Sequence, residues 1–358
     1  MKYIINGKFY SQNITGVQRF AREIIMELDN LVDDNCEIEV AICKDCINIP
    51  LLKKIKTVII GPFKGGVMWE QFNLPLYVRS QNAVCINLCN SMPIFSKNIT
   101  VLHDVSFKVN PQFYARKINL WTNFVVLSCI YRLRKIITVS NFSKSEIISN
   151  YQINENQIEV IYNGWQHYKR IEYAENCLKK YGLEKGNFYF AMSSLTKNKN
   201  FKWIAENAKK NPNITYAVSG SINKRVFSDA FDFEVPSNMK FLGYVSDEEA
   251  KTLMRDCKAF LFPTFYEGFG IPPLEALSVG AKIVVSDASC MREIYGETAY
   301  YIDPYNPNVD LDELLKETVA DPSEALGKYS WKKSAEKLYQ LLFDTENGVT
   351  EKRRKHFK

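Results

Sequence analysis

Residues 262–280 read FPTFYEGFGIPPLEALSVG, and this stretch decides the architecture of the chain. The apolar run Ala259–Phe262 that leads into it is typical of a buried strand, and a Gly-Phe-Gly turn follows. Pro272 and Pro273 suit the first turn of a helix, which we expect to continue to Val279. A strand, a glycine-rich turn and a helix in this order predict one repeat of a parallel α/β fold.

The same stretch predicts an anion site. The Gly268-Phe269-Gly270 turn precedes a helix N-terminus, where free backbone N–H groups and the positive end of the helix dipole face a ligand. Glu267 lies in the turn, and Glu275 follows eight residues later, where its carboxylate can accept hydrogen bonds from vicinal hydroxyls such as those of a ribose. Two glutamates at this spacing also arise by chance, so the prediction rests on the whole context. Phosphate donors beside hydroxyl acceptors suit a nucleotide diphosphate that carries a sugar.

This segment resembles the paired-glutamate signature of the retaining GT-B glycosyltransferases of family 4. The resemblance implies a GT-B fold, with two Rossmann-like domains whose parallel sheets face a central cleft. It also implies transfer of a sugar from a nucleotide-diphosphate donor to a hydroxyl with retained anomeric configuration. In that reading Glu275 holds the ribose, Glu267 meets the sugar hydroxyls, and the Gly268–Gly270 turn stabilises the leaving phosphate.

The length and the alternation of short apolar runs with amphipathic stretches independently predict two α/β domains. A chain of 358 residues is too long for one ordinary core. We expect an acceptor-side domain over residues 1–165, a nucleotide-sugar-binding domain over 166–342 and a basic tail over 343–358. The charged stretch Gln166–Gly186 is the expected linker. Ligands of open parallel sheets bind at the carboxyl ends of strands, so the site is expected in the cleft between the domains.

The composition excludes several classes of protein. The chain is mildly basic, but its Lys and Arg residues are scattered and no nucleic-acid-reading motif accompanies them. No signal peptide is recognised, and nine cysteines without regular spacing fit buried thiols in a reducing cytoplasm, so we expect a cytoplasmic protein. Cys43 and Cys46 form a lone C-x-x-C, which is weak evidence for zinc. We expect no metal and no cofactor other than the donor substrate.

The first helix of the chain carries the next candidate residues. Gly16 follows the first predicted strand and begins a helix, where phosphate or developing negative charge is favoured. The run from Asn6 to Glu23 resembles the N-terminus of family 4, in which this loop approaches the donor or the acceptor. We expect Gly16 and Arg19 to bind substrate.

His103 and Asp104 end another predicted strand at the expected cleft. A His-Asp pair is more often structural than catalytic, but this pair matches the His-Asp element of the family's first domain. The resemblance implies that His103 contacts the transferred sugar and that Asp104 orients His103 or the acceptor. Of the other histidines, His167 falls in the expected linker and His356 in the basic tail, so His103 is the one candidate for catalysis.

The loop 192–201 follows the first strand of the second domain and resembles the family's phosphate-binding loop. The family carries an arginine early in this loop and a lysine just before the helix. Lys199 matches the lysine, but Ser193 or Ser194 stands near the place of the arginine. Lys197 or Arg19 is therefore expected to supply the second positive charge.

The segment Ile118–Leu133 is mostly apolar but too short and too polar for a membrane span. We expect a helix buried within the protein. The alternative is an interfacial helix, because Arg116, Lys117, Arg132, Arg134 and Lys135 lie at its ends. Peripheral membrane association is a further expectation.

The function expected from all of this is glycosyl transfer to a glycan or lipid-linked acceptor, with a nucleotide sugar as the donor. Two alternatives remain at this level: a nucleotide-sugar epimerase on the same fold, and a non-catalytic module that binds sugar nucleotides. Release of nucleoside diphosphate only in the presence of an acceptor distinguishes transfer from both.

Overall fold

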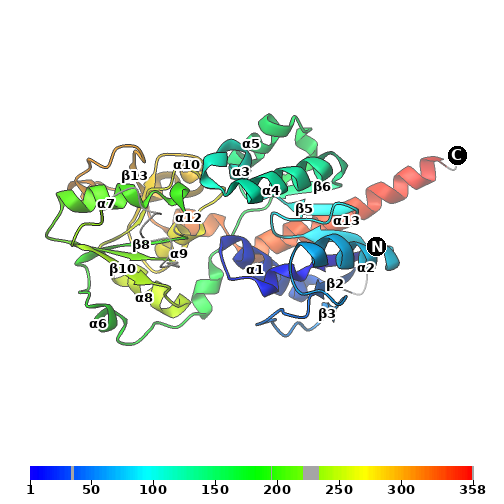
Figure 1. Cartoon of the computed structure of the whole chain (residues 1–358), viewed down its shortest axis with the longest axis horizontal. Helices are drawn as coiled ribbons and strands as arrows, with labels where there is room; N and C mark the ends of the chain where they lie inside the picture. Colours follow the sequence, from blue (N-terminus) through cyan, green and yellow to red (C-terminus); the bar gives the residue numbers. More distant parts are fainter. Residues whose placement is uncertain (34–35, 195, 221–233, 357–358) are drawn as a thin grey trace. The chain divides into compact units, whose positions relative to one another are not determined.

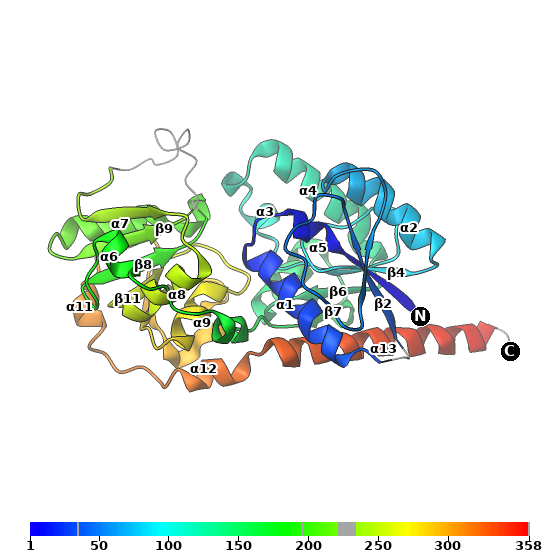
Figure 2. The same cartoon turned by 90° about the horizontal axis from the view of Figure 1, so that it is seen from below.

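The chain folds into two units, which Figures 1 and 2 show in two views. The computed structural model describes residues 1–33, 36–194, 196–220 and 234–356, and the side chains of these residues up to Phe343 except that of Arg132. Unit 1 comprises Met1–Asn163 and Ser330–Lys358, and unit 2 comprises Gly164–Tyr329. Residues 357 and 358 of the expected basic tail lie outside the described residues, and the rest of that tail continues helix α13 to His356.

Unit 1 is built on a seven-stranded sheet with the order β3-β2-β1-β4-β5-β6-β7, in which every pairing is parallel. The central strands are buried on both faces because helices cover both sides of the sheet (Figure 1). The strands are β1 (Lys2–Asn6), β2 (Glu37–Ile42), β3 (Lys56–Ile59), β4 (Val84–Asn87), β5 (Asn98–Val101), β6 (Lys135–Thr138) and β7 (Ile158–Val160). The α-helices are α1 (Gly16–Leu31), α2 (Leu74–Ser80), α3 (Ser106–Val109), α4 (Arg116–Cys129), α5 (Asn141–Tyr151) and α13 (Trp331–His356).

Helix α13 belongs to unit 1, which corrects the expectation that the second domain runs to residue 342. Its buried stripe of Trp331, Ala335, Leu338 and Leu342 has helical spacing. The indole of Trp331 packs edge-on against Phe20 of α1 with ring centres 6.0 Å apart, and the Tyr3 hydroxyl donates to the Leu342 carbonyl at 2.8 Å. An amphipathic stripe shows that a helix has a core-facing side, but it does not say which core completes it.

Unit 2 is a six-stranded parallel sheet with the order β10-β9-β8-β11-β12-β13. Its strands are β8 (Phe188–Met192), β9 (Thr215–Ser219), β10 (Met239–Gly243), β11 (Ala259–Phe262), β12 (Ile283–Ser286) and β13 (Tyr300–Ile302). Its α-helices are α6 (Cys177–Tyr181), α7 (Phe201–Lys210), α8 (Asp247–Asp256), α9 (Ile271–Ser278), α10 (Met291–Tyr295), α11 (Leu311–Leu314) and α12 (Ser323–Lys328). The predicted pair of parallel α/β, Rossmann-like units is confirmed.

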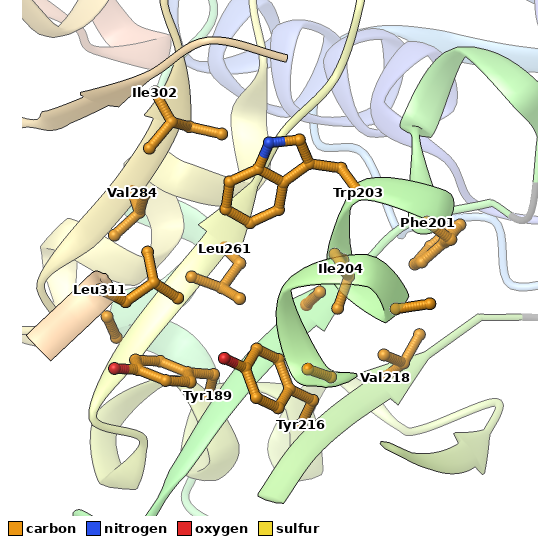
Figure 3. Packing of buried hydrophobic residues seen from close by; sticks show 14 of the residues in the cluster. Tyr189, Phe201, Trp203, Ile204, Tyr216, Val218, Leu261, Val284, Ile302 and Leu311 are labelled. Atoms are coloured by element: carbon orange, nitrogen blue, oxygen red, sulfur yellow. The ribbon is translucent and has the colours of Figure 1, made fainter. Parts of the chain in front are cut away.

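The core under α7 fixes the start of that helix relative to the sheet (Figure 3). Trp203 and Ile204 of α7 pack against strand residues including Leu261 and Val218. The Trp203 indole N–H also donates to the carbonyls of Asp303 and Asn306, both at 3.0 Å. The loop that precedes α7 is therefore held firmly at the carboxyl end of β8.

The segment expected to be a linker is part of unit 2. A 3-10 helix over Gln166–Arg170 and helix α6 occupy it, and the chain passes between the units after Asn163 and again after Tyr329. Lys251 of α8 ties this segment down, because its Nζ donates to the carbonyls of Tyr168 at 2.7 Å and Ile171 at 2.6 Å. The charges that suggested a linker lie mostly on the outside of this docked segment.

Helix α4 buries only one side, which corrects the expectation of a fully buried helix. Val125, Val126 and Cys129 enter the core of unit 1, whereas Leu120 is 71% exposed and Phe124 is 56% exposed. Other apolar side chains on the exposed side are Ile118, Trp121, Leu127 and the adjacent Tyr131. Among the described residues, no helix has both the length and the apolar character needed to cross a bilayer.

Candidate active site

The turn between β11 and α9 contains a glycine at which any other residue would be strained. Gly270 has a φ of 82°, in the left-handed region that favours glycine. A Cβ at this position would lie 2.9 Å from Cε of Met291 and 3.3 Å from a ring carbon of Phe262. The Gly270 carbonyl accepts a hydrogen bond from the buried Tyr295 hydroxyl. The side chain of Phe269 packs edge-on against Tyr329, so only its backbone can serve the expected anion site.

The loop before α7 is joined to this turn by Asn200. Asn200 adopts a left-handed backbone conformation with a φ of 56°, which asparagine tolerates better than most residues. Its side-chain amide donates to the carbonyls of Pro263 at 2.9 Å and Pro304 at 2.8 Å. The backbone N–H of Phe265 donates to the Asn198 carbonyl at 2.9 Å. These bonds tie residues 198–200 to the carboxyl end of β11.

The two loops bring together a predicted lysine and a predicted glutamate. Lys199 Nζ lies 2.6 Å from Glu267 Oε1, and both side chains are largely buried. The Glu267 backbone N–H donates to the Ser289 hydroxyl at 3.1 Å. Lys197 lies in the same 3-10 turn as Lys199, but it is exposed. The carboxyl ends of β8 and β11 thus present one positive and one negative group side by side.

Glu275, in helix α9, is held by a histidine that the sequence analysis had assigned to the linker. His167 Nε2 lies 2.8 Å from Glu275 Oε1, and the His167 side chain is 1% exposed. The linker prediction rested on the charged residues after His167. The aromatic neighbours Trp165 and Tyr168 were the local signal that this part of the segment is buried.

In unit 1, Gly16 and Arg19 lie in the first turn of α1, as expected. Gly16 is exposed and Arg19 is half-buried. The side chain of Gln18 caps the N-terminus of the helix, because its oxygen accepts a hydrogen bond from the Thr15 backbone N–H at 3.2 Å. The Arg19 N–H donates to the Thr15 carbonyl at 2.8 Å, so the first helical hydrogen bond is in place.

His103 is a buried, neutral imidazole at the carboxyl end of β5. Its Nε2 is 3.0 Å from the Leu88 carbonyl and therefore carries the proton, and its backbone N–H donates to the Asn90 side chain at 2.7 Å. Phe20 of α1 packs edge-on against the ring at 5.0 Å. Burial lowers the pKa of His103 from 6.5 to about 4. His103 is thus uncharged near neutral pH.

Asp104 forms a local turn, since its carboxylate accepts the Ser106 backbone N–H at 2.9 Å at the start of α3. The hydrogen bonds that fix His103 come from Leu88 and Asn90. Asp104 therefore stabilises the start of α3, in addition to the role expected from the family.

A buried network missed by the sequence analysis supports the loop that holds His103. Glu70 accepts hydrogen bonds from Asn6 at 2.9 Å and Ser91 at 2.7 Å, and it pairs with Lys8 at 2.6 Å. The Glu70 side chain is 3% exposed, so its charge depends on these partners. No local pattern marks Glu70, because its partners come from separate segments of the chain.

One cavity of unit 1 lies away from these residues. It measures about 390 Å³ and is lined by residues that include Ala83, Asn98 and Leu133, at the amino ends of β4, β5 and β6. His103 follows the opposite, carboxyl end of β5, the edge at which parallel sheets bind ligands. The candidate residues therefore form two groups, one in each unit: Lys199, Glu267, Glu275 and the Gly268–Gly270 turn in unit 2, and Gly16, Arg19, His103 and Asp104 in unit 1.

The profile of the family described as "Glycosyl transferases group 1" matches residues 175–338, which include Lys199, Glu267 and Glu275. The chain carries a group 1 glycosyltransferase domain. The family resemblance of residues 262–280 is thereby confirmed.

Two curated proteins named as mannosyltransferases are similar to this chain. The O-antigen chain mannosyltransferase RfbU of Salmonella typhimurium is 26% identical over 240 residues, which cover 66% of this chain and 65% of the relative. The serotype-specific mannosyltransferase WbdA of Escherichia coli is 24% identical over 97% of this chain, but the match covers 46% of that longer protein.

Solved structures of similar proteins confirm the GT-B fold. Anabaena Alr3699/HepE, solved in complex with UDP and glucose, is 15% identical and aligns with a TM-score of 0.71 over 96% of this chain and 100% of that chain. WaaG, a glycosyltransferase involved in lipopolysaccharide biosynthesis, aligns with a TM-score of 0.62 over 94% of each chain. At this identity the likeness concerns the fold alone.

Proposed function

We propose that this chain transfers a hexose, and specifically mannose, from a nucleotide-diphosphate donor to a hydroxyl of a glycan or lipid-linked acceptor with retention of configuration. The observation that carries the proposal is the pairing of Lys199 with Glu267 beside the N-terminus of α9. The choice of mannose rests on the printed activities of the curated relatives.

The residues of unit 2 bind different parts of the donor. Lys199 and the backbone of the Gly268–Gly270 turn stabilise the negative charge that grows on the leaving phosphate. Glu267 accepts hydroxyls of the transferred sugar, and Glu275 accepts those of the ribose. A second cation is supplied by Lys197, which is exposed, or by Arg19 of unit 1, with Gly16 allowing close approach.

The ion pair gives Glu267 a defined orientation before the donor binds. A carboxylate has two oxygens and about four acceptor sites, so Glu267 can bond Lys199 and still accept a sugar hydroxyl. The ammonium of Lys199 has three donors and can bridge Glu267 and a phosphate oxygen. The Lys199 ammonium and the Glu267 carboxylate are thus in position before the donor binds, which reduces the reorganisation that the reaction needs.

The residues of unit 1 position the transferred sugar and the acceptor. Since His103 donates its Nε2 proton to Leu88, its Nδ1 is an acceptor for a sugar hydroxyl. A neutral imidazole with a lowered pKa is a poor acid near neutral pH, so positioning is the role we assign to His103. Asp104, at the start of α3, serves the acceptor hydroxyl.

The exposed face of α4 supports peripheral binding to an anionic membrane surface. No Asp or Glu occurs between Asp104 and Glu146, whereas seven Lys and Arg residues lie in that interval. Exposed Trp121, Phe124 and Leu120 add the apolar and aromatic side chains that insert at a bilayer interface. Such binding would place the enzyme next to a lipid-linked acceptor.

A release assay tests the proposal. The purified full-length chain is incubated with a panel of nucleotide sugars, with and without a glycan or lipid-linked acceptor. Nucleoside diphosphate released only with the acceptor, together with a lengthened acceptor, is the expected result. Conversion of the donor into an epimer without release would favour an epimerase, and binding without turnover would favour a non-catalytic module.

A further inference from the structure

His167 lies outside every motif recognised in the sequence, yet it contacts Glu275 of the proposed donor site. It lies in the 3-10 helix Gln166–Arg170, and its imidazole is buried against the carboxylate of Glu275, with Nε2 and Oε1 2.8 Å apart. Glu275 lies in α9, 108 residues further along the chain. The side chains are 1% and 9% exposed respectively, so the pair is nearly removed from water and only a small part of the Glu275 side chain is exposed.

The segment that carries His167 is anchored on both sides. The Trp165 indole N–H donates to the Leu326 carbonyl and the Gln166 amide donates to the Tyr329 carbonyl, both at 3.0 Å. On the other side, Lys251 Nζ donates to the carbonyl of Tyr168 at 2.7 Å. The Tyr168 ring also packs edge-on against the imidazole at 5.2 Å. The imidazole is therefore fixed by the fold, and the carboxylate of Glu275 adopts the orientation that the imidazole allows.

A glutamate near a helix start has several rotamers, and a ligand that needs one of them loses affinity by freezing the others. A hydrogen bond to Oε1 removes this freedom in advance and directs Oε2 as the acceptor for a ligand. Because Oε1 accepts, His167 must donate from Nε2, which both the neutral tautomer and the imidazolium can do.

We propose that His167 is a positioning residue that orients Glu275 toward the vicinal hydroxyls of the donor's ribose. This inference rests on the donor role proposed above for Glu275. It assigns to His167 a part in selecting a ribonucleotide, and no part in the chemical step.

A purely structural His167 would stabilise unit 2 without affecting which nucleotides bind. The two roles therefore differ in one measurable ratio, the preference for a ribonucleoside diphosphate over its 2′,3′-dideoxy counterpart. If Glu275 is oriented by His167, the preference falls when the Nε2 donor is removed. If His167 only fills space, all affinities change together and the ratio stays constant.

The experiment is calorimetric titration of the full-length chain with GDP and UDP and with their 2′,3′-dideoxy forms. Three variants are compared with the wild type: His167→Phe removes the donor, His167→Gln keeps an N–H near the place of Nε2, and Tyr168→Phe removes a hydroxyl from the same 3-10 helix. We expect His167→Phe to reduce the ribose preference by about tenfold, the equivalent of one lost hydrogen bond. His167→Gln should restore most of it, and Tyr168→Phe should leave it unchanged.

The outcomes separate this inference from the proposed function. An unchanged ribose preference in His167→Phe overturns the positioning role and leaves the proposed function intact. A wild type that binds neither nucleotide overturns both, and one that binds but shows no ribose preference overturns the assignment of Glu275. If His167→Phe does not fold, as judged by its melting transition, His167→Leu removes the same donor with a smaller side chain: a reduced ribose preference supports the role, and an unchanged preference contradicts it.

Discussion

Lys199 and Glu267, which are 68 residues apart in the sequence, form an ion pair with Nζ and Oε1 separated by 2.6 Å. Both residues are predicted for the site from the sequence, but as separate contacts to the donor. The structure couples them, so that a change at either position removes a contact that orients the other side chain.

Replacement of Lys199 by alanine should lower kcat by about 10²–10³, the cost of one lost donor to transition-state charge. Because Lys199 lies in a loop, the fold should be retained. Steady-state kinetics measure the effect. Lys202→Ala, at an exposed position of α7, is the matched control, and Lys197→Ala tests the alternative phosphate ligand. If Lys199→Ala stays within a few-fold of wild type while Lys197→Ala loses activity, Lys197 is the phosphate ligand.

The two glutamates should give different kinetic signatures. Glu275→Ala should mainly raise KM for the donor, because the ribose is remote from the reacting carbon. Glu267→Ala should mainly lower kcat, because it removes a contact to the transferred sugar and leaves Lys199 without its partner. Initial rates over a range of donor concentrations distinguish the two. If Glu275→Ala instead mainly lowers kcat and Glu267→Ala mainly raises KM, the assignment of roles is refuted but the family is not.

The buried His103 should make the protein sensitive to acid. Its pKa is about 4 in the folded chain against an ordinary value of 6.5, so the unfolded chain binds more protons between these values. The contribution of His103 to the free energy of unfolding should therefore be complete above pH 6.5. It should fall by about 3 kcal/mol as the pH decreases from 6.5 to 4. Urea denaturation at several pH values measures the slope. His103→Gln should show a shallower slope, and equal slopes would mean that His103 is not buried in its neutral form.

The transfer should retain the anomeric configuration without a covalent sugar–enzyme intermediate and without added metal. Glu267 is engaged by Lys199 and assigned to sugar hydroxyls, so departure of the phosphate and attack by the acceptor are expected on the same face of the sugar. Activity should persist in EDTA, and NMR of the product should show the anomer of the donor. An inverted product, or a sugar trapped on Glu267 or His103, would disprove this mechanism.

Membrane binding, if α4 mediates it, should depend on both charge and the exposed apolar side chains. The chain should float with vesicles that contain anionic lipid and be released by a high-salt wash. Leu120→Glu with Phe124→Glu should abolish flotation, because both side chains are more than half exposed on α4. Tyr244→Glu, at an exposed position of unit 2, is the control and should float normally. Flotation of the double variant at the wild-type level would exclude this face.

Long-range pairings explain most of what the sequence analysis missed. Glu70 and Lys8 form a buried pair in unit 1, and His167 joins Glu275 in unit 2, yet neither pair has a spacing that could reveal it. The solvent-facing side of α4 was also missed. Its apolar residues occur all round the helix, so the sequence could not show that only Val125, Val126 and their neighbours reach a core.

The sequence by itself determined the features that depend on neighbouring residues. The apolar run, the glycines and the two prolines of residues 259–280 specify β11, the turn and α9, and Glu267 and Glu275 follow from their places in that local geometry. The tertiary structure decided which distant segments meet. It placed α13 in unit 1, docked the expected linker onto α8, and brought His167 and Lys199 to the two glutamates. The physical reason is that backbone geometry is set within a few residues, whereas burial and ion pairing are set by whichever surfaces the folded chain brings into contact.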